Sequence, residues 1–96
     1  MVRSYRSRGE IIEDILKAAS VGAKKTRIMQ RANLNPWMFK KYFPVLLKNG
    51  LIVDDDDPDG GSMYALTDKG KEVLKMYRVL RAKFRKENDG KPIQFL

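Results

Sequence analysis

The dipeptide Asn35-Pro36 constrains the fold of this chain more than any other feature, because it marks where one helix must end and another begin. Asparagine is a favoured N-cap, and proline is favoured at the first position of a helix, where its missing N–H costs no hydrogen bond. The residues on both sides carry apolar side chains at helical spacing. We therefore expect two helices, over residues 24–33 and 36–49, that are joined by a tight turn.

The second of these helices contains an irregularity at Pro44. Proline cannot donate the hydrogen bond that the Lys40 carbonyl would accept in a regular helix, so the helix must bend or break there. The apolar spacing nevertheless continues through Pro44, and we expect a kink rather than an end. Gly50 is expected to terminate the helix, since glycine readily adopts the left-handed conformation that follows helix ends.

Another helix precedes this pair, and a hairpin and a long helix follow it. Isoleucine, leucine and alanine recur at helical spacing in residues 9–20, opposite a charged face. Residues 51–53 and 62–67 are short β-branched or aromatic runs joined by a turn-rich link, which predicts a β-hairpin. Thr67 is then a suitable N-cap for a long helix over residues 68–88.

The order of these elements indicates the fold class. Three helices, a β-hairpin and a long final helix predict a mainly α protein with a β-hairpin wing, the winged helix-turn-helix, whose third helix lies in the major groove of DNA. No internal repeat or linker divides the 96 residues, so we expect a single domain. Its parts are a basic arm over residues 1–8, the winged helix-turn-helix over 9–67, a dimerisation helix over 68–88 and a tail over 89–96.

The composition excludes several kinds of chemistry. The chain has no cysteine and no histidine, so it lacks thiolate metal ligands, disulfides and the commonest general base at neutral pH. We expect no enzyme activity, no cofactor, no metal and no small-molecule substrate. Charge interrupts every apolar run and no signal peptide is visible, which predicts a cytoplasmic, nucleoid-associated protein without a membrane partner. The net charge of +8 favours a nucleic acid as the partner.

Twelve residues are candidate contacts to double-stranded DNA. Lysine and arginine side chains bind phosphates, and apolar side chains at the start of the third helix would meet thymine methyl groups and sugars. The candidates are Arg3, Arg6 and Arg8 in the arm, Lys24, Lys25, Arg27 and Arg31 at the second helix, and Asn35, Trp37, Met38, Lys40 and Lys41 on the third. The alternative for Trp37 is that it covers the core, and the alternative for the arm is that it makes no fixed contact.

An acidic run, DDDDPDGG, stands out from this basic chain. Asp55, Asp57, Asp59 and Gly60 match the opening of a calcium-binding loop, but Leu66 occupies the position where the twelfth-residue glutamate is required. We interpret the run as the solvated tip of the wing, which does not lie on phosphates and orients the molecule on DNA by repulsion. The alternative is a calcium-responsive switch.

The last helix has an apolar seam with the 4-3-4 spacing of a coiled coil, formed by Val73, Tyr77, Leu80 and Phe84. The end of this seam lies at least a dozen residues beyond the hairpin, roughly 18 Å along a helix axis and past the edge of so small a core. An exposed seam of this kind predicts a homodimer held by a coiled coil. The alternative is that the helix packs against its own domain.

Residues 8–86 resemble an archaeal family of small winged-helix, chromatin-associated DNA-binding proteins that dimerise through a C-terminal antiparallel coiled coil. The likeness rests on RGEIIEDILKAASVGAKKTRIMQRANLN, LLKNGLI and YALTDKGKEVL. It implies DNA binding through the third helix and wing, dimerisation through the fourth helix, and an archaeal or archaeal-virus setting. The sequence departs from the family pattern at Pro44 and in the acidity of its wing.

Together these features predict a dimeric DNA-binding protein, either a transcription regulator or a nucleoid-associated protein. The alternative is a winged-helix module that binds another protein and does not bind DNA.

Overall fold

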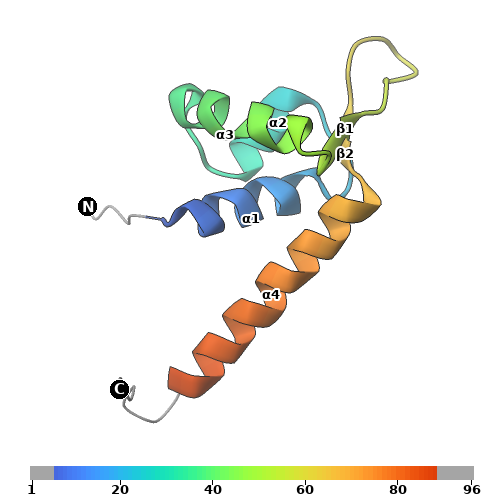
Figure 1. The fold of residues 1–96 in the computed structure, drawn as a ribbon. Helices are drawn as coiled ribbons and strands as arrows, with labels where there is room; N and C mark the ends of the chain where they lie inside the picture. Colours follow the sequence, from blue (N-terminus) through green and yellow to red (C-terminus); the bar gives the residue numbers. More distant parts are fainter. Residues whose placement is uncertain (1–5, 89–96) are drawn as a thin grey trace.

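A computed structural model describes the backbone of residues 6–88 and the side chains of residues 6–84. Three short helices pack around one another, a small hairpin follows, and the last helix runs from the hairpin past α1 and away from the other helices (Figure 1). The elements in order are α1 (Arg8–Ala19), α2 (Lys25–Arg31), α3 (Pro36–Lys48), β1 (Ile52–Asp54), β2 (Tyr64–Leu66) and α4 (Asp68–Asn88). This is the winged helix-turn-helix that the sequence predicts.

Helix α1 begins one residue earlier than the apolar spacing predicts, because Ser7 forms a capping box with Glu10. The Ser7 hydroxyl accepts a hydrogen bond from the Glu10 N–H, and the Glu10 carboxylate accepts one from the Ser7 N–H at 2.8 Å. The donated N–H lowers the pKa of Glu10. A capping box satisfies two of the N–H groups that a helix start leaves without an intrahelical partner.

The turn between α2 and α3 is longer than expected, because α2 ends at Arg31 rather than at residue 33. Asn33 has φ of 56°, in the left-handed region that asparagine tolerates better than most residues. Asn35 is the N-cap of α3, as predicted, and its side-chain oxygen accepts a hydrogen bond from the Met38 N–H at 2.8 Å. Helix α3 then continues through Pro44, which confirms that the proline does not end it.

The hairpin is short, and its sheet gains a contact that the sequence did not reveal. Strands β1 and β2 pair antiparallel with Val53 opposite Ala65. Tyr64 also forms a bridge with Ala23, whose N–H and carbonyl hydrogen bond to the Tyr64 backbone at 2.9 and 2.8 Å. The bridge ties the segment between α1 and α2 to the base of the wing.

The core lies where the three short helices meet the sheet. Phe39 and Phe43 on α3 stack with ring centroids 4.6 Å apart, and Phe43 meets Tyr64 edge to face at 5.0 Å. The buried apolar residues around them are Ile11, Ile15, Leu16, Ala18, Ala19, Ala23, Ile28, Ala32, Leu46, Leu51, Ile52, Leu66 and Leu74.

Helix α4 can start against the sheet only because residue 70 is glycine. A Cβ atom at Gly70 would lie 2.0 Å from the carbonyl oxygen of Leu51. Thr67 caps the helix, as predicted, and accepts a hydrogen bond from the Gly70 N–H. The glycine that weakens the first helical turn is therefore required for the close approach of α4 to Leu51, the residue before β1.

The charged face expected on α1 is partly buried against α4. Glu13 is only 5% exposed, and its carboxylate accepts a hydrogen bond from the Arg81 guanidinium at 2.6 Å. Tyr77 lies against Gly9, where an added Cβ would come within 3.3 Å of the tyrosine ring. These contacts attach the middle of α4 to α1, and they bury Glu13 of the charged face that the sequence predicts on α1.

The predicted seam on α4 divides into two parts. Val73 and Tyr77 are half-buried, and Val73 packs against the core of its own domain. Leu80 and Phe84 are 52% and 60% exposed. The second half of the seam is therefore the more exposed part, and Val73, which the sequence predicts as a dimer contact, packs within its own domain. None of the helices in the described part of the chain is both long and apolar enough to span a membrane.

Candidate nucleic-acid interface

Helix α3 presents an exposed aromatic and basic face beside its buried one. Trp37 is 69% exposed, so the alternative that it covers the core is wrong. Lys40 and Lys41 are exposed next to it, and the Lys41 ammonium lies 5.5 Å from the centre of the Trp37 ring. Such a cation–π contact contributes about 0.5–1 kcal/mol at an exposed site and holds the two side chains together. The arrangement places the flat indole ring of Trp37 and the positive charge of Lys41 side by side on one helix.

Two other α3 residues predicted to contact DNA have structural roles. Met38 is half-buried and packs against the core rather than projecting outward. Asn35 is exposed, but its side-chain oxygen is occupied by the N-cap hydrogen bond. Of the predicted contacts at α3, Trp37, Lys40 and Lys41 are therefore the ones that are exposed without such a role.

Helix α2 adds basic side chains beside this face. Lys25, Arg27 and Arg31 are exposed. Arg31 also makes a long hydrogen bond, 3.4 Å, to the carbonyl of Ala18 at the end of α1. These cations have the chemistry needed to bind phosphates.

The arm residue Arg6 has an internal role that the sequence did not indicate. Its guanidinium donates to Asp14 at 2.6 Å and to the carbonyls of Ala32 and Asn33 at 2.8 Å each. Arg6 thus holds the turn between α2 and α3 against α1, and its guanidinium is engaged within the molecule. Arg8 is exposed at the start of α1, whereas Arg3 lies outside the described residues.

Lys24 is also engaged within the molecule, with the wing. Its ammonium lies 2.9 Å from the carboxylate of Asp57 and donates to the Gly60 carbonyl at 3.1 Å. The hydrogen bond from Lys24, together with one from the Asp59 N–H, lowers the pKa of Asp57. Lys24 therefore neutralises one wing carboxylate and holds the wing loop close to the start of α2.

The carboxylates of the acidic loop bind its own backbone and side chains. Asp54 accepts hydrogen bonds from the Asp56 N–H and the Ser62 hydroxyl, and Asp57 accepts one from the Asp59 N–H. These are local turn interactions of a kind that aspartate commonly makes. Within residues 6–84, no group of three or more acidic side chains is placed to hold a metal ion.

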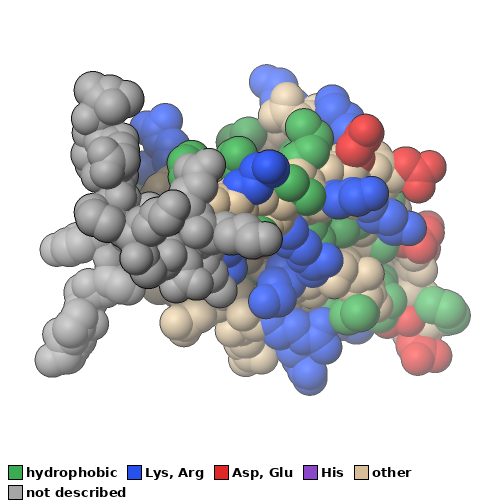
Figure 2. Space-filling view, turned by 90° about the horizontal axis from the view of Figure 1, so that it is seen from below, with side chains coloured by type: hydrophobic (Ala, Val, Ile, Leu, Met, Phe, Trp, Pro, Cys, Tyr) green, Lys and Arg blue, Asp and Glu red, His purple; other side chains and the backbone are tan. Residues whose placement is uncertain are grey.

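The charges on the lower face of the molecule are separated along its length. Figure 2 shows lysine and arginine side chains across the middle of this face and acidic side chains toward the end where the wing lies. Helix α4 is itself rich in positive charge, with Lys75, Arg78, Arg81 and Lys83 exposed along it. A polyanion would thus be attracted to the helices and repelled from the wing tip.

Comparison with known proteins identifies the class to which this fold and surface belong. A family model described as winged helix-turn-helix matches residues 5–85, and the chain belongs to this family. A relative in Methanocaldococcus jannaschii, the uncharacterized protein MJ0287, is 38% identical over 72 residues, which are 74% of this chain and 69% of the relative.

Solved structures with the same fold include proteins of known role. Sso10a-2, a DNA-binding protein from Sulfolobus solfataricus, is 28% identical with a TM-score of 0.71, over 85% of this chain and 84% of that one. The transcriptional regulator BldR from the same organism is 22% identical with a TM-score of 0.68, over 86% of this chain and 63% of that one. The regulator PcaV from Streptomyces coelicolor is 22% identical with a TM-score of 0.67, over 98% and 67%. The likeness to BldR and PcaV shows the fold.

Proposed function

We propose that this chain is a homodimeric DNA-binding protein, a transcription regulator or a nucleoid-associated protein, that binds duplex DNA through α3 and the basic residues of α2. It acts by binding and not by catalysis. The observation that supports this proposal best is the exposed group of Trp37, Lys40 and Lys41 on the outer face of α3.

The chemistry of that group suits a DNA groove. The third helix of a winged helix-turn-helix enters the major groove, where lysine side chains reach base edges or phosphates. An indole at the start of the helix would pack against sugars or thymine methyl groups. Lys25, Arg27 and Arg31 on α2 and Arg8 on α1 would then neutralise phosphates on either side, since all four are exposed.

Two residues that the sequence predicts as DNA contacts have structural roles in this proposal. Arg6 stabilises the α2–α3 turn, and Lys24 pairs with Asp57 and positions the wing. The acidic wing tip stays away from phosphates, and its negative charge directs the α2–α3 face toward the DNA.

The dimer is proposed to form through the outer part of α4. Four large apolar side chains there are half or more exposed within a helix that extends beyond the core, namely Met76, Val79, Leu80 and Phe84. Apolar surface of this extent on a helix is most simply covered by a second copy of the same chain. The likeness to Sso10a-2, a DNA-binding protein, supports DNA as the ligand of the assembly.

The affinity for duplex DNA at a series of salt concentrations tests the proposal. Trp37 is the only tryptophan of the chain, so its fluorescence reports contact at the proposed site. If six basic residues of a protomer neutralise phosphates, log K falls against log salt with a slope of about −5. No binding at low salt would favour the alternative of a protein-binding module.

A double substitution locates the contact surface. Lys40→Ala with Lys41→Ala should weaken binding and make the slope shallower by about 2, without unfolding the domain. Lys48→Ala, at the end of the same helix, serves as the control and should change the slope little. Unchanged affinity in the double variant would show that α3 is not the element that contacts DNA.

A further inference from the structure

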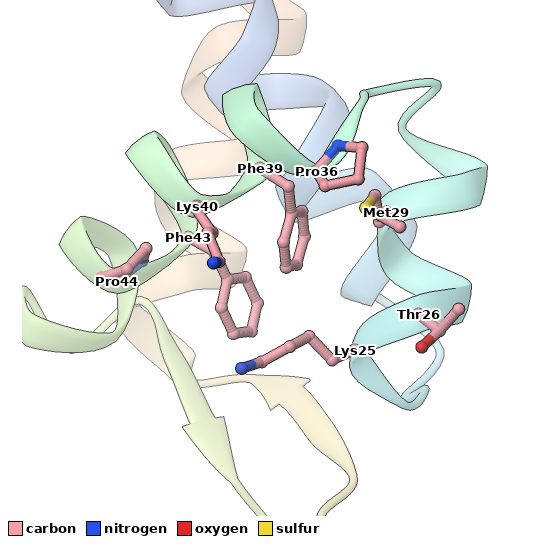
Figure 3. A pocket seen from close by; sticks show the side chains of 8 residues that line it. All are labelled: Lys25, Thr26, Met29, Pro36, Phe39, Lys40, Phe43 and Pro44. Carbon is pink, nitrogen blue, oxygen red and sulfur yellow. The ribbon is translucent and has the colours of Figure 1, made fainter.

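A cavity of about 200 Å³ opens between α2 and α3, beside the surface proposed to bind DNA. Figure 3 shows that its walls come from both helices, with Phe39 and Phe43 between them. The residues that line it are Lys25, Thr26, Met29, Pro36, Phe39, Lys40, Phe43 and Pro44. Most of these side chains are apolar, so the cavity favours an apolar group over water.

The walls of the cavity are held in place before any ligand arrives. The Phe43 ring is fixed on one side by stacking on Phe39 and on another by its edge-to-face contact with Tyr64. Two of the other lining residues are prolines, whose rings have little conformational freedom. A preformed apolar surface of this kind binds a small ring without the cost of ordering flexible side chains.

The cavity also provides a structural role for Pro44, which the proposed DNA contact does not explain. A proline in the interior of a helix costs about 3 kcal/mol relative to alanine, and nothing in the proposed DNA contact requires it. Here the Pro44 side chain forms one wall of the cavity.

The ionisable side chains that line the cavity are both positive. The Lys25 ammonium lies 5.8 Å from the centre of the Phe43 ring. Lys40 comes from the opposite helix, and in Figure 3 the ammonium ends of both lysines lie toward Phe43. An occupant that combines an apolar ring with one negative charge would satisfy both the walls and the lysines. A phosphate would leave the walls uncovered, and a neutral ring would leave the two ammonium groups uncompensated.

We propose that this cavity binds a small aromatic carboxylate. The ring would lie mainly against Met29, Pro36 and Pro44, because Phe39 and Phe43 are only 4% and 2% exposed. The carboxylate would pair with Lys25 and Lys40. The volume limits the ligand to roughly one ring, because a cavity of about 150 Å³ takes a benzene molecule and drug-sized ligands need about 300 Å³ or more. So small and open a site implies a dissociation constant on the order of 0.1–10 mM.

Occupation of the cavity would weaken DNA binding. Lys25 and Lys40 are two of the cations proposed to neutralise phosphates, and a bound carboxylate would occupy both ammonium groups and offset one of their two positive charges. This consequence rests on the proposed function, whereas binding of the carboxylate itself does not.

Nuclear magnetic resonance on the full chain tests the binding step. Benzoate is the probe, and acetate and benzamide are the controls that lack the ring and the charge; the ionic strength is held constant. The expected result is saturable amide shifts confined to α2 and the first two-thirds of α3, with at least tenfold weaker binding of both controls. Shifts that do not saturate, that follow lysines all over the surface, or that acetate or benzamide reproduce would overturn the proposal.

Matched variants test the assignment of the two lysines. Lys25→Gln combined with Lys40→Gln should weaken benzoate binding fivefold or more, while Lys48→Gln on the same helix should leave it unchanged. Both variants are exposed-surface changes whose folding is checked by circular dichroism. A double variant that folds and binds benzoate as tightly as the parent protein would contradict the proposal.

The effect on DNA is measured separately. Benzoate should lower the affinity for duplex DNA several-fold more than acetate at the same ionic strength. Equal effects of the two salts would refute the coupling. If the protein binds benzoate at α2 and α3 but binds no DNA at all, the ligand site stands and the proposed function fails.

Discussion

At the scale of single residues, this fold depends on a few close contacts that charge and hydropathy patterns do not disclose. Gly70 allows α4 to start against the Leu51 carbonyl, and Arg6 binds two carbonyls of the helix-turn-helix turn. In the sequence, Gly70 is an unfavourable residue in a helix and Arg6 is one of several arginines in a basic arm. The backbone carbonyls that these two residues approach lie 19 or more positions away along the chain. The spacing of neighbouring residues cannot reveal such contacts.

Gly70→Ala should destabilise the domain strongly. The added methyl group would lie 2.0 Å from a backbone oxygen, so β1 or α4 must move. The expected loss is roughly 2–3 kcal/mol in the free energy of unfolding, measured by urea denaturation. Lys71→Ala, an exposed change in the same turn, should alter stability by less than about 0.5 kcal/mol. Equal stability of the two variants would show that Gly70 does not approach Leu51 this closely.

Arg6→Ala should reduce stability and leave the salt dependence of DNA binding unchanged. The variant loses charge-assisted hydrogen bonds to two carbonyls and to Asp14, which contribute about 1–2 kcal/mol at this partly exposed site. Arg8→Ala is the matched change at an exposed arginine, and it should instead make the salt slope shallower by about 1. The assignment of Arg6 would fail if its variant behaved in both measurements like the Arg8 variant.

At the scale of elements, much of the fold was readable because each boundary has a local chemical cause. Asn35 and Pro36 start α3, and Gly50 follows its end with φ of 74°. The sequence could not show which half of the α4 seam is buried in the domain and which half is exposed. Val73 and Leu80 are both apolar, and only the packing of α1 against α4 distinguishes them. Likewise, the exposed Trp37 was ambiguous in the sequence, since indole rings occur both in cores and at contact surfaces.

The capping box of α1 should make stability depend on acidic pH through Glu10. The Ser7 N–H lowers the folded-state pKa of this carboxyl below its ordinary value of 4.5. A group with a lowered pKa contributes stability above the unfolded-state value, and this contribution is lost as the pH falls below about 4.5 through the folded-state value. Glu10→Gln should therefore be less stable than the parent protein at pH 7, with the difference shrinking toward pH 3. Glu72→Gln, an exposed change on α4, is the control. A difference that stays constant over this pH range in urea unfolding would speak against the capping box.

At the scale of the whole molecule, the chain is more extended than a compact domain. Its radius of gyration is 15.3 Å, against about 12 Å expected for a compact domain of this length. The excess comes from α4, which runs past the core with exposed Leu80 and Phe84 (Figure 1). If a second copy packs on this helix, the resulting dimer carries two α2–α3 surfaces and can bind two stretches of DNA.

Leu80→Glu should convert the proposed dimer into a monomer of 11.1 kDa in analytical ultracentrifugation. A buried charge at the centre of an apolar helix interface costs more than the interface gains from its remaining contacts. Ala82→Glu adds the same charge on another face of α4 and should leave the dimer intact. A Leu80→Glu protein that remains dimeric would show that the dimer interface does not include this part of α4.

The most direct test of the central claim is to map the DNA contact residue by residue with backbone amide shifts on adding a duplex. We expect the largest changes at residues 25–31 and 36–42, in α2 and the first half of α3, with little change in the acidic loop at residues 55–61. Changes that are largest in that loop, or that are absent from α3 at saturating DNA, would contradict the assignment of α3 as the surface that binds DNA.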